Sequence, residues 1–279
     1  HRDLHSFPTR RSSDLLGRHL VAALALLPFW LARGAKLPAR GEWPRVIAMG
    51  LLGFTVYNLL INAGGRSIPA GTSSFIAAGI PVMLTVGGRI FFGERLRPAG
   101  WVGVAVALAG VAAIAFGAGG GLRLSRGALL VLAGAVCTAA GGLVSKGLLA
   151  RHAPLEITTW SMWIGTLGLL LLPAGWGLPA AVRTAPWPAT ANMVALGLVS
   201  GALCQTMWTF AISRMPISRA ANWRFLIPAI SVGLGWLILG ELPAPAAFAG
   251  GIVTLCGVVI VDRFGRAAAR AAAVPDAPA

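Results

Sequence analysis

The sequence is short of charged residues and of cysteine, and both shortages narrow the classes of protein that it can encode. Asp, Glu, Lys and Arg make up 11% of the 279 residues, less than half of the quarter that is usual in soluble domains. Cys137, Cys204 and Cys256 each lie inside an apolar segment without metal-binding spacing, so we expect no disulfide framework and no metal site. The phosphate-binding pattern Gly-x(4)-Gly-Lys-Ser/Thr does not occur. We therefore expect no ATP and no cofactor.

Acidic residues are the scarcer of the charged types, at 8 against 23 Lys and Arg. None of them falls in the middle of an apolar segment, which leaves a carboxylate proton relay unsupported. The formal net charge of +15 would suggest a nucleic-acid partner in a soluble protein. Here the arginines lie between apolar segments, which is typical of an orientation signal in a membrane protein, and we expect no nucleic-acid binding.

Apolar residues are abundant, at 57% of the chain with a mean hydropathy of +0.78. Runs long enough to cross a bilayer, for which about 20 residues suffice, recur along the whole length. They are too long and too uniformly apolar for the alternating strands of a barrel. We predict an all-α membrane protein with nine visible helices, at 16–33, 46–65, 69–91, 98–117, 127–149, 155–175, 190–212, 217–239 and 244–262.

The sequence also contains an internal duplication with an offset of 147 residues. Without a gap, this offset pairs Pro69 with Pro216, Ile80-Pro81 with Ile227-Pro228, Gly93-Glu94 with Gly240-Glu241, Pro98 with Pro245, Gly103 with Gly250, and Gly110-Val111 with Gly257-Val258. Shared apolar composition does not account for so many matches at one offset, so we interpret the chain as a tandem repeat.

The second repeat has five predicted helices and the first shows four, so the counterpart of 127–149 would precede residue 1. Residues 5–14, HSFPTRRSSD, resemble the translation of a common sequencing-library adapter. We interpret residues 1–15 as an artefact, to be excluded from fold reasoning, and expect the native gene to encode another apolar helix ahead of Leu16. The predicted domains are a first repeat at 16–126, a second at 127–263 and a cytoplasmic tail at 264–279.

The distribution of Lys and Arg predicts the orientation. Outside residues 1–15, thirteen lie in loops or helix ends on one side of the predicted membrane and five on the other. The richer side should be cytoplasmic, which places the C-terminus inside the cell. Because each repeat has an odd number of helices, the two repeats should have inverted topology, as in many secondary transporters.

The pattern Pro-x(11)-Pro-x(11)-Gly-Glu-x(3)-Pro ends both repeats and resembles the EamA family of the drug/metabolite transporter superfamily. It is carried by Pro69, Pro81, Gly93-Glu94 and Pro98, and by Pro216, Pro228, Gly240-Glu241 and Pro245. The resemblance covers residues 16–263 and implies a ten-helix inverted-repeat carrier in the inner membrane, often an exporter of amino acids or other small metabolites. The implied partners are a small-molecule substrate and the lipid bilayer, and a homodimer stays open.

Three other functions compete with an amino-acid or drug exporter. A nucleotide-sugar or sugar-phosphate carrier of the same superfamily would bind an anion, which Arg224 suits. A membrane-embedded lipid enzyme would need clustered titratable groups, whereas His19 and His152 have no obvious partner in the sequence. A non-transporting lipid or assembly protein also stays open.

Six polar or aromatic residues inside the predicted helices are the candidate substrate-binding residues: Asn58, Asn62, Gln205, Trp208, Asn222 and Arg224. A charge inside a span usually marks function, although Arg224 could instead snorkel to the cytoplasmic face. Asn58 and Gln205 are equivalent in the repeat, which favours a shared site, although amides also hold helices together.

Four residues are candidates for hinge or structural roles: Pro81, Pro228, Glu94 and Glu241. We expect both prolines in mid-helix, where they would kink the chain at matching points of the two repeats. Both glutamates fall beside Gly at helix ends, and we interpret them as structural.

Overall fold

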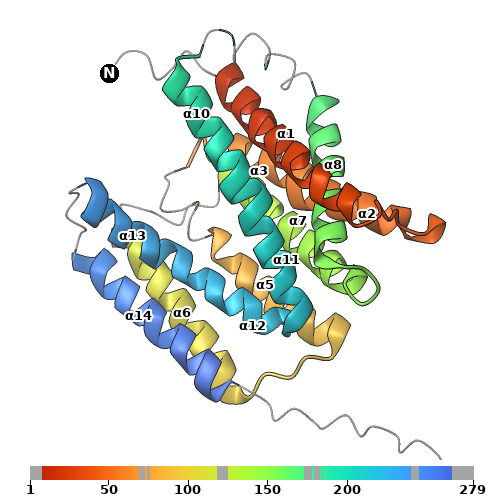
Figure 1. Ribbon diagram of the computed structural model, residues 1–279. Coiled ribbons are helices and arrows are strands. Elements are labelled where there is room, and N and C mark those ends of the chain that lie inside the picture. Colours follow the sequence, from red (N-terminus) through yellow and green to blue (C-terminus); the bar gives the residue numbers. More distant parts are fainter. Residues whose placement is uncertain are drawn as a thin grey trace, which may run out of the picture. The chain divides into compact units, whose positions relative to one another are not determined.

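The computed structural model describes residues 8–68, 73, 76–117, 125–172, 178, 183, 185–239 and 245–265. Every regular element within these ranges is a helix, and the helices form two compact units. The first unit comprises residues 1–68 and 124–217, and the second comprises 69–123 and 218–279. Each unit therefore draws helices from both sequence repeats (Figure 1).

Among its described residues, the first unit contains five long helical segments. They are α1 (Pro8–Ala32), the run from η1 (Arg40–Glu42) through α2 (Trp43–Gly50) and η2 (Leu51–Val56) to α3 (Tyr57–Gly64), then α7 (Arg126–Leu148), α8 (Pro154–Leu170), and the run α10 (Trp187–Leu196), η4 (Gly197–Cys204) and α11 (Gln205–Arg214). Helix α1 packs on α8 and on η4, and α3 packs on α7.

Glycine lets α7 come close to η2 and α3. Gly127, Gly134 and Gly141 recur every seven residues along α7. A side chain at Gly141 would stand 2.9 Å from the main-chain nitrogen of Gly53, and one at Gly127 would stand 2.9 Å from the carbonyl oxygen of Gly64. Small residues at such a spacing allow main chains to approach inside a membrane, where hydrophobic burial does not drive association.

The second unit contains α5 (Gly79–Phe92), α6 (Pro98–Gly117), α12 (Ile217–Asn222), η5 (Trp223–Phe225), α13 (Leu226–Leu239) and α14 (Pro245–Phe264). Helices α6 and α14 lie side by side along their lengths (Figure 1). The buried core of this unit lies between them and Phe225, and includes Val104, Ala107, Val111, Val258 and Val261.

The close contacts between α6 and α14 are related by a local two-fold axis. Gly103 meets Val261, Ala107 meets Gly257, Gly110 meets Thr254 and Ile114 meets Gly250. Numbers rise along one helix as they fall along the other, so the helices are antiparallel. Exchanging each residue for its repeat equivalent reproduces the same set of contacts. Two repeat-related helices in antiparallel contact confirm the inverted tandem repeat.

The duplication extends to the bounds of several elements. With the offset of 147, α5 coincides with α13 and α6 coincides with α14 at both ends, and η2 falls within η4. Each of the nine predicted segments contains a helix. The structure also continues α1 back to Pro8, inside the stretch that we exclude from fold reasoning.

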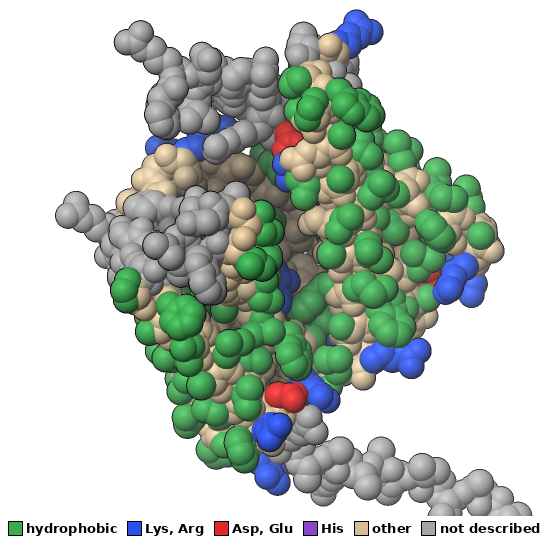
Figure 2. Space-filling model, turned by 60° about the vertical axis from the view of Figure 1, so that its left-hand side comes forward, with side chains coloured by type: hydrophobic (Ala, Val, Ile, Leu, Met, Phe, Trp, Pro, Cys, Tyr) green, Lys and Arg blue, Asp and Glu red, His purple; other side chains and the backbone are tan. Residues whose placement is uncertain are grey.

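The surface of these helices is largely apolar. In Figure 2, hydrophobic side chains cover most of the visible helical surface, and Lys and Arg gather in a few small groups. Among the described residues, four helical segments are long and apolar enough to cross a membrane: 14–32, 40–64, 126–148 and 187–214. Exposed residues such as Phe91, Leu171 and Leu237 would be costly in water and suit contact with lipid. The fold is that of an all-α membrane protein.

Candidate functional site

The candidate residues Asn58 and Gln205 both lie at the end of a π-helical segment. η2 ends at Val56, two residues before Asn58, and η4 ends at Cys204, directly before Gln205. π-helical turns are rare in proteins and occur frequently at functional sites. Because a π-helical segment occurs at the same place in both repeats, we treat this part of the first unit as a candidate functional site. The periodicity of the sequence predicts uninterrupted helices here and gives no sign of the π turns.

The amide of Asn58 is engaged with its own helix. Its Nδ2 donates to the carbonyl oxygen of Phe54 at 2.7 Å, and Asn62 Nδ2 donates to the carbonyl oxygen of Asn58 at 2.6 Å. Gln205 and Trp208 are both half-buried on the counterpart helix. Among the described residues, no hydrogen bond joins Asn58 to Gln205. The two amides that the repeat relates are thus placed in the same unit without direct pairing.

His19 of α1 approaches Asn58 from the neighbouring helix. Its Nδ1 lies 2.8 Å from the carbonyl oxygen of Leu15, and its Nε2 lies 3.5 Å from Asn58 Nδ2. The imidazole also meets the ring of Phe54 edge-on, with centroids 5.8 Å apart. The sequence shows no partner for His19, because Asn58 is 39 residues away on another helix. The duplication could have drawn attention to His19, because its equivalent in the second repeat is a threonine, Thr166, and the titratable side chain occurs in one repeat alone.

In the second unit, Asn222 and Arg224 lie where the predicted helix 217–239 is interrupted. α12 ends at Asn222, η5 carries Arg224, and α13 begins at Leu226. Pro228 has no N–H to donate to the carbonyl of Arg224 four residues earlier, which explains the interruption. Arg224 is half-buried.

Asn222 is 2% exposed and donates from Nδ2 to the carbonyl oxygen of Val258 at 3.1 Å. Its Oδ1 is buried without a hydrogen-bond partner among the described residues. A buried acceptor without a donor costs free energy, so each such atom calls for an explanation.

The two prolines lie at equivalent places, each near the start of an assigned α-helix. Pro81 is the third residue of α5, and Pro228 is the third residue of α13. Within the first turn of a helix the missing N–H would have no intrahelical partner anyway. In the second repeat the chain is helical from Ile217 through η5 to Leu239, and Pro228 lies inside that run. The bend expected at the two prolines stays a prediction.

Glu94 joins the end of one helix to the start of another. Gly93 ends α5 in the left-handed conformation, with φ of 64°. The next residue, Glu94, accepts hydrogen bonds from the main-chain N–H of Ser218 at 2.9 Å and from its Oγ at 2.6 Å. The carboxylate thus caps the N-terminus of α12. Its repeat equivalent, Glu241, lies outside the described residues.

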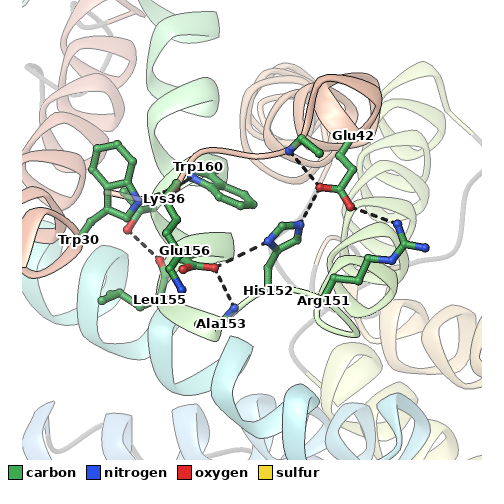
Figure 3. A network of polar contacts seen from close by, with 11 residues as sticks. Trp30, Lys36, Glu42, Arg151, His152, Ala153, Leu155, Glu156 and Trp160 are labelled. Atoms are coloured by element: carbon green, nitrogen blue, oxygen red, sulfur yellow. Dashed lines mark hydrogen bonds and ion pairs between the residues drawn. The ribbon is translucent and has the colours of Figure 1, made fainter. Parts of the chain in front are cut away.

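A polar cluster joins the η1 turn to the start of α8 in the first unit. In Figure 3, His152 stands between the carboxylates of Glu42 and Glu156. His152 Nε2 lies 2.8 Å from Glu42 Oε2, and Arg151 approaches the other oxygen at 3.5 Å. The sequence shows no partner for His152, whereas the structure gives it two. Each carboxylate also accepts a main-chain N–H at its helix start, so the cluster fastens two chain segments.

Two tryptophans extend this cluster. Trp30 Nε1 and Trp160 Nε1 both donate to the carbonyl oxygen of Lys36, at 3.1 and 3.2 Å. The His152 imidazole meets the Trp160 ring edge-on at 4.8 Å. Trp160 thus has a specific partner in the loop after α1, beyond the role in an aromatic belt that its type suggests. Among the described residues, no group of three His, Cys, Asp or Glu side chains could hold a metal ion.

Comparisons with known proteins agree with this architecture. The EamA-like transporter family matches residues 15–116 and again residues 125–262. The curated "Probable terminal-alkyne amino-acid exporter" of Streptantibioticus cattleyicolor is 36% identical over 263 residues, which cover 93% of this chain and 86% of that protein. The "Uncharacterized transporter YdfC" of Bacillus subtilis is 30% identical over 244 residues, 87% of this chain and 79% of that protein.

A solved crystal structure shares the fold, with a TM-score of 0.73 at 19% identity, over 93% of this chain and 90% of that chain. The two family matches fall on the two halves of the duplication seen in the sequence and in the α6–α14 pair. The chain belongs to the EamA-like transporter family and is a multi-pass membrane transporter of a small molecule.

Proposed function

We propose that this transporter exports small amino-acid-like metabolites across the inner membrane by alternating access. The observation that carries the proposal is the 36% identity, over nearly the whole chain, to a protein named as an amino-acid exporter. The C-terminus lies in the cytoplasm in this proposal, because the loops on that side hold thirteen Lys and Arg against five on the other. A reporter fused to the C-terminus should be active in the cytoplasm, and strong periplasmic activity would reverse the assignment.

The interruption between α12 and α13 supplies groups that suit an amino acid. The planar guanidinium of Arg224 can bind a carboxylate through two parallel hydrogen bonds, which an ammonium group cannot do. Asn222, two residues earlier, has a buried Oδ1 that lacks a donor. An α-ammonium group would supply that donor. The two side chains therefore match the two charged ends of a zwitterion.

The test is counterflow in proteoliposomes loaded with L-propargylglycine, an amino acid with a terminal alkyne. Counterflow should be measurable and should be inhibited by other amino acids. Arg224→Lys should impair counterflow, because lysine keeps the positive charge but cannot donate two parallel hydrogen bonds to a carboxylate. Arg224→Ala should impair counterflow more. Arg219→Lys is the matched control, because Arg219 lies on α12, is exposed and pairs with Asp262 at 3.2 Å. It should transport normally.

Two outcomes would count against the proposal. Full counterflow in Arg224→Ala would remove the guanidinium from the substrate site. Inhibition by nucleotide sugars or sugar phosphates, with none by amino acids, would favour the anionic-substrate carrier instead. Each variant is compared at equal amounts of folded protein in the vesicles, so that a loss of insertion is not mistaken for a loss of transport.

A further inference from the structure

The geometry of His19 fixes which of its nitrogens carries the proton in the neutral ring. A carbonyl oxygen only accepts hydrogen bonds, so the contact of Nδ1 with the main-chain oxygen of Leu15 at 2.8 Å places the hydrogen on Nδ1. Although Leu15 ends the stretch that we exclude, this acceptor is main chain and any residue type at this position supplies it. Nε2 is then an acceptor, and it faces the Nδ2 group of Asn58 at 3.5 Å. The Asn58 amide is oriented by its other contact, because only its NH2 can donate to the carbonyl oxygen of Phe54.

The second repeat shows what this helix position needs for structure alone. Thr166, the equivalent of His19, donates from Oγ1 to the carbonyl oxygen of Met162 at 2.7 Å. Met162 is the equivalent of Leu15, so the two repeats make the same bond to the residue four positions earlier. A threonine meets that requirement without a titratable group. The Nε2 atom of His19 therefore goes beyond what the packing of this position requires.

Protonation of Nε2 would reach the main chain of η2 through Asn58. The imidazolium has two donors, so Nε2 would then face the NH2 of Asn58 donor to donor. Relief requires the amide to turn and present Oδ1, which breaks the 2.7 Å bond from Nδ2 to the carbonyl oxygen of Phe54. Phe54 lies within the π-helical turns. A proton on His19 thus changes both a candidate substrate-binding side chain and the helix segment that carries it.

Few charged groups surround this ring in the described residues. Arg18 is the adjacent residue and forms an ion pair with Asp14. Of the packed elements, α8 carries Glu156, which binds Ala153 and lies near His152, η4 carries Cys204, α3 carries Tyr57, and α10 carries no titratable residue. No carboxylate is paired with His19 among these. Imidazole is the side chain whose ordinary titration falls nearest neutral pH.

We propose that His19 is the proton-binding residue through which export is coupled to the proton gradient. The inference rests on the proposed export function. A proton from outside binds Nε2, its charge crosses the membrane as the carrier changes state, and it is released to the cytoplasm while substrate moves outward. Asn58 links the two events, because its amide turns when the proton binds.

The first experiment measures the steady-state gradient of L-propargylglycine across proteoliposomes, with and without an imposed pH difference. A steady-state ratio does not depend on how fast a variant works. Exchange of one proton for one zwitterion moves one net charge, so the membrane potential is held at zero with potassium and valinomycin. A one-unit pH difference then supports an about tenfold substrate gradient. His19→Thr keeps the bond seen at Thr166 and removes the titratable atom, and it should bring the ratio to about one. His152→Gln removes the other described histidine and should keep the wild-type ratio.

The second experiment needs no substrate. With ¹⁵N-labelled histidine and asparagine in detergent, NMR should show His19 Nε2 gaining a proton between pH 5 and 8, with the Asn58 NH2 signals moving at the same midpoint. The Asn58 response should vanish in His19→Thr. A His19 ring that stays neutral down to pH 5 would overturn the proposal even if export is confirmed. A wild-type pH response in His19→Thr vesicles would also overturn it. Absence of propargylglycine transport with intact His19 titration would instead count against the export function alone.

Discussion

Gly257 offers a direct test of the packing that joins the two repeats. A Cβ at this position would stand 2.7 Å from the carbonyl oxygen of Gly103 and 2.7 Å from Ala107 Cα. Carbon atoms in good contact are about 3.5–4.0 Å apart. Because the obstructing atoms are main chain, no side-chain rotation can relieve them. In Gly257→Ala the helices α6 and α14 must separate by on the order of 1 Å. A gap of that size removes about a quarter to a half of the dispersion energy of each atomic contact between them.

The expected loss is at the upper end of the range for overpacking, about 2–3 kcal/mol in the free energy of unfolding. For a chain of this size that corresponds to a fall in Tm of roughly 4–12 °C. The assay is melting in detergent, followed by size-exclusion chromatography of a fluorescent fusion. Gly233→Ala is the control, because nothing lies within 4 Å of a Cβ there and alanine has the higher helix propensity.

The local two-fold axis adds a second comparison. Gly110 is the repeat equivalent of Gly257, and a Cβ on it would stand 2.6 Å from the carbonyl oxygen of Gly250. Gly110→Ala should therefore lower Tm by a similar amount. The double variant should lose less than the sum, because the first substitution has already separated the helices. A Gly257→Ala protein with the same Tm as the Gly233→Ala protein would refute the reasoning.

Three further predictions concern single polar contacts. Thr55→Val removes the hydrogen bond from Thr55 Oγ1 to the carbonyl oxygen of Gly165 at 3.0 Å and should cost about 0.5–1.5 kcal/mol in a melting assay. Thr159→Val should cost less, because Thr159 bonds only within its own helix. Glu94→Ala removes the cap on α12 and should lower the free energy of unfolding by about 1 kcal/mol. Adding Ser218→Ala should lower it little further, and additive losses in the double variant would argue against the cap. Lys146→Met removes the hydrogen bonds that Lys146 Nζ donates to the carbonyl oxygens of Ile212 and Met215 at the end of α11. It should speed hydrogen exchange there, with exchange at α8 unchanged.

Much of the architecture could be predicted from the sequence, because it depends on patterns that one helix carries by itself. Long apolar runs indicate spanning helices, and an offset shared by prolines and glycines reveals the duplication. The bounds of α6 and α14 match the predicted segments 98–117 and 244–262 to within two residues. Contacts between distant segments could not be predicted this way. His152 shows the difference, because its two carboxylate partners depend on how a loop folds against the start of another helix.

The helix interruptions also escaped prediction, since they depend on hydrogen bonding. A proline in an apolar run does not say where the helical hydrogen bonding changes; in the structure α5 and α13 are assigned from two residues ahead of Pro81 and Pro228. The π turns of η2 and η4 leave no trace in apolar periodicity. The sequence singles out Asn58 and Gln205 of the first unit and Asn222 and Arg224 of the second unit by residue type, and their role in substrate binding stays a prediction. It does not single out His19, and it does not predict the local backbone at any of these residues.

Comparing the two repeats position by position separates packing from function. Where main chains touch, as at Gly103 and Gly250 or Gly110 and Gly257, both repeats keep glycine, because a Cβ would collide in either copy. At the polar interior positions the repeats differ: His19 corresponds to Thr166, and Arg224 corresponds to Ala77. A symmetric scaffold needs symmetric contacts, whereas one substrate or one proton needs a single binding group. The departures from symmetry, rather than the matches, are therefore where the chemistry of this transporter should be sought.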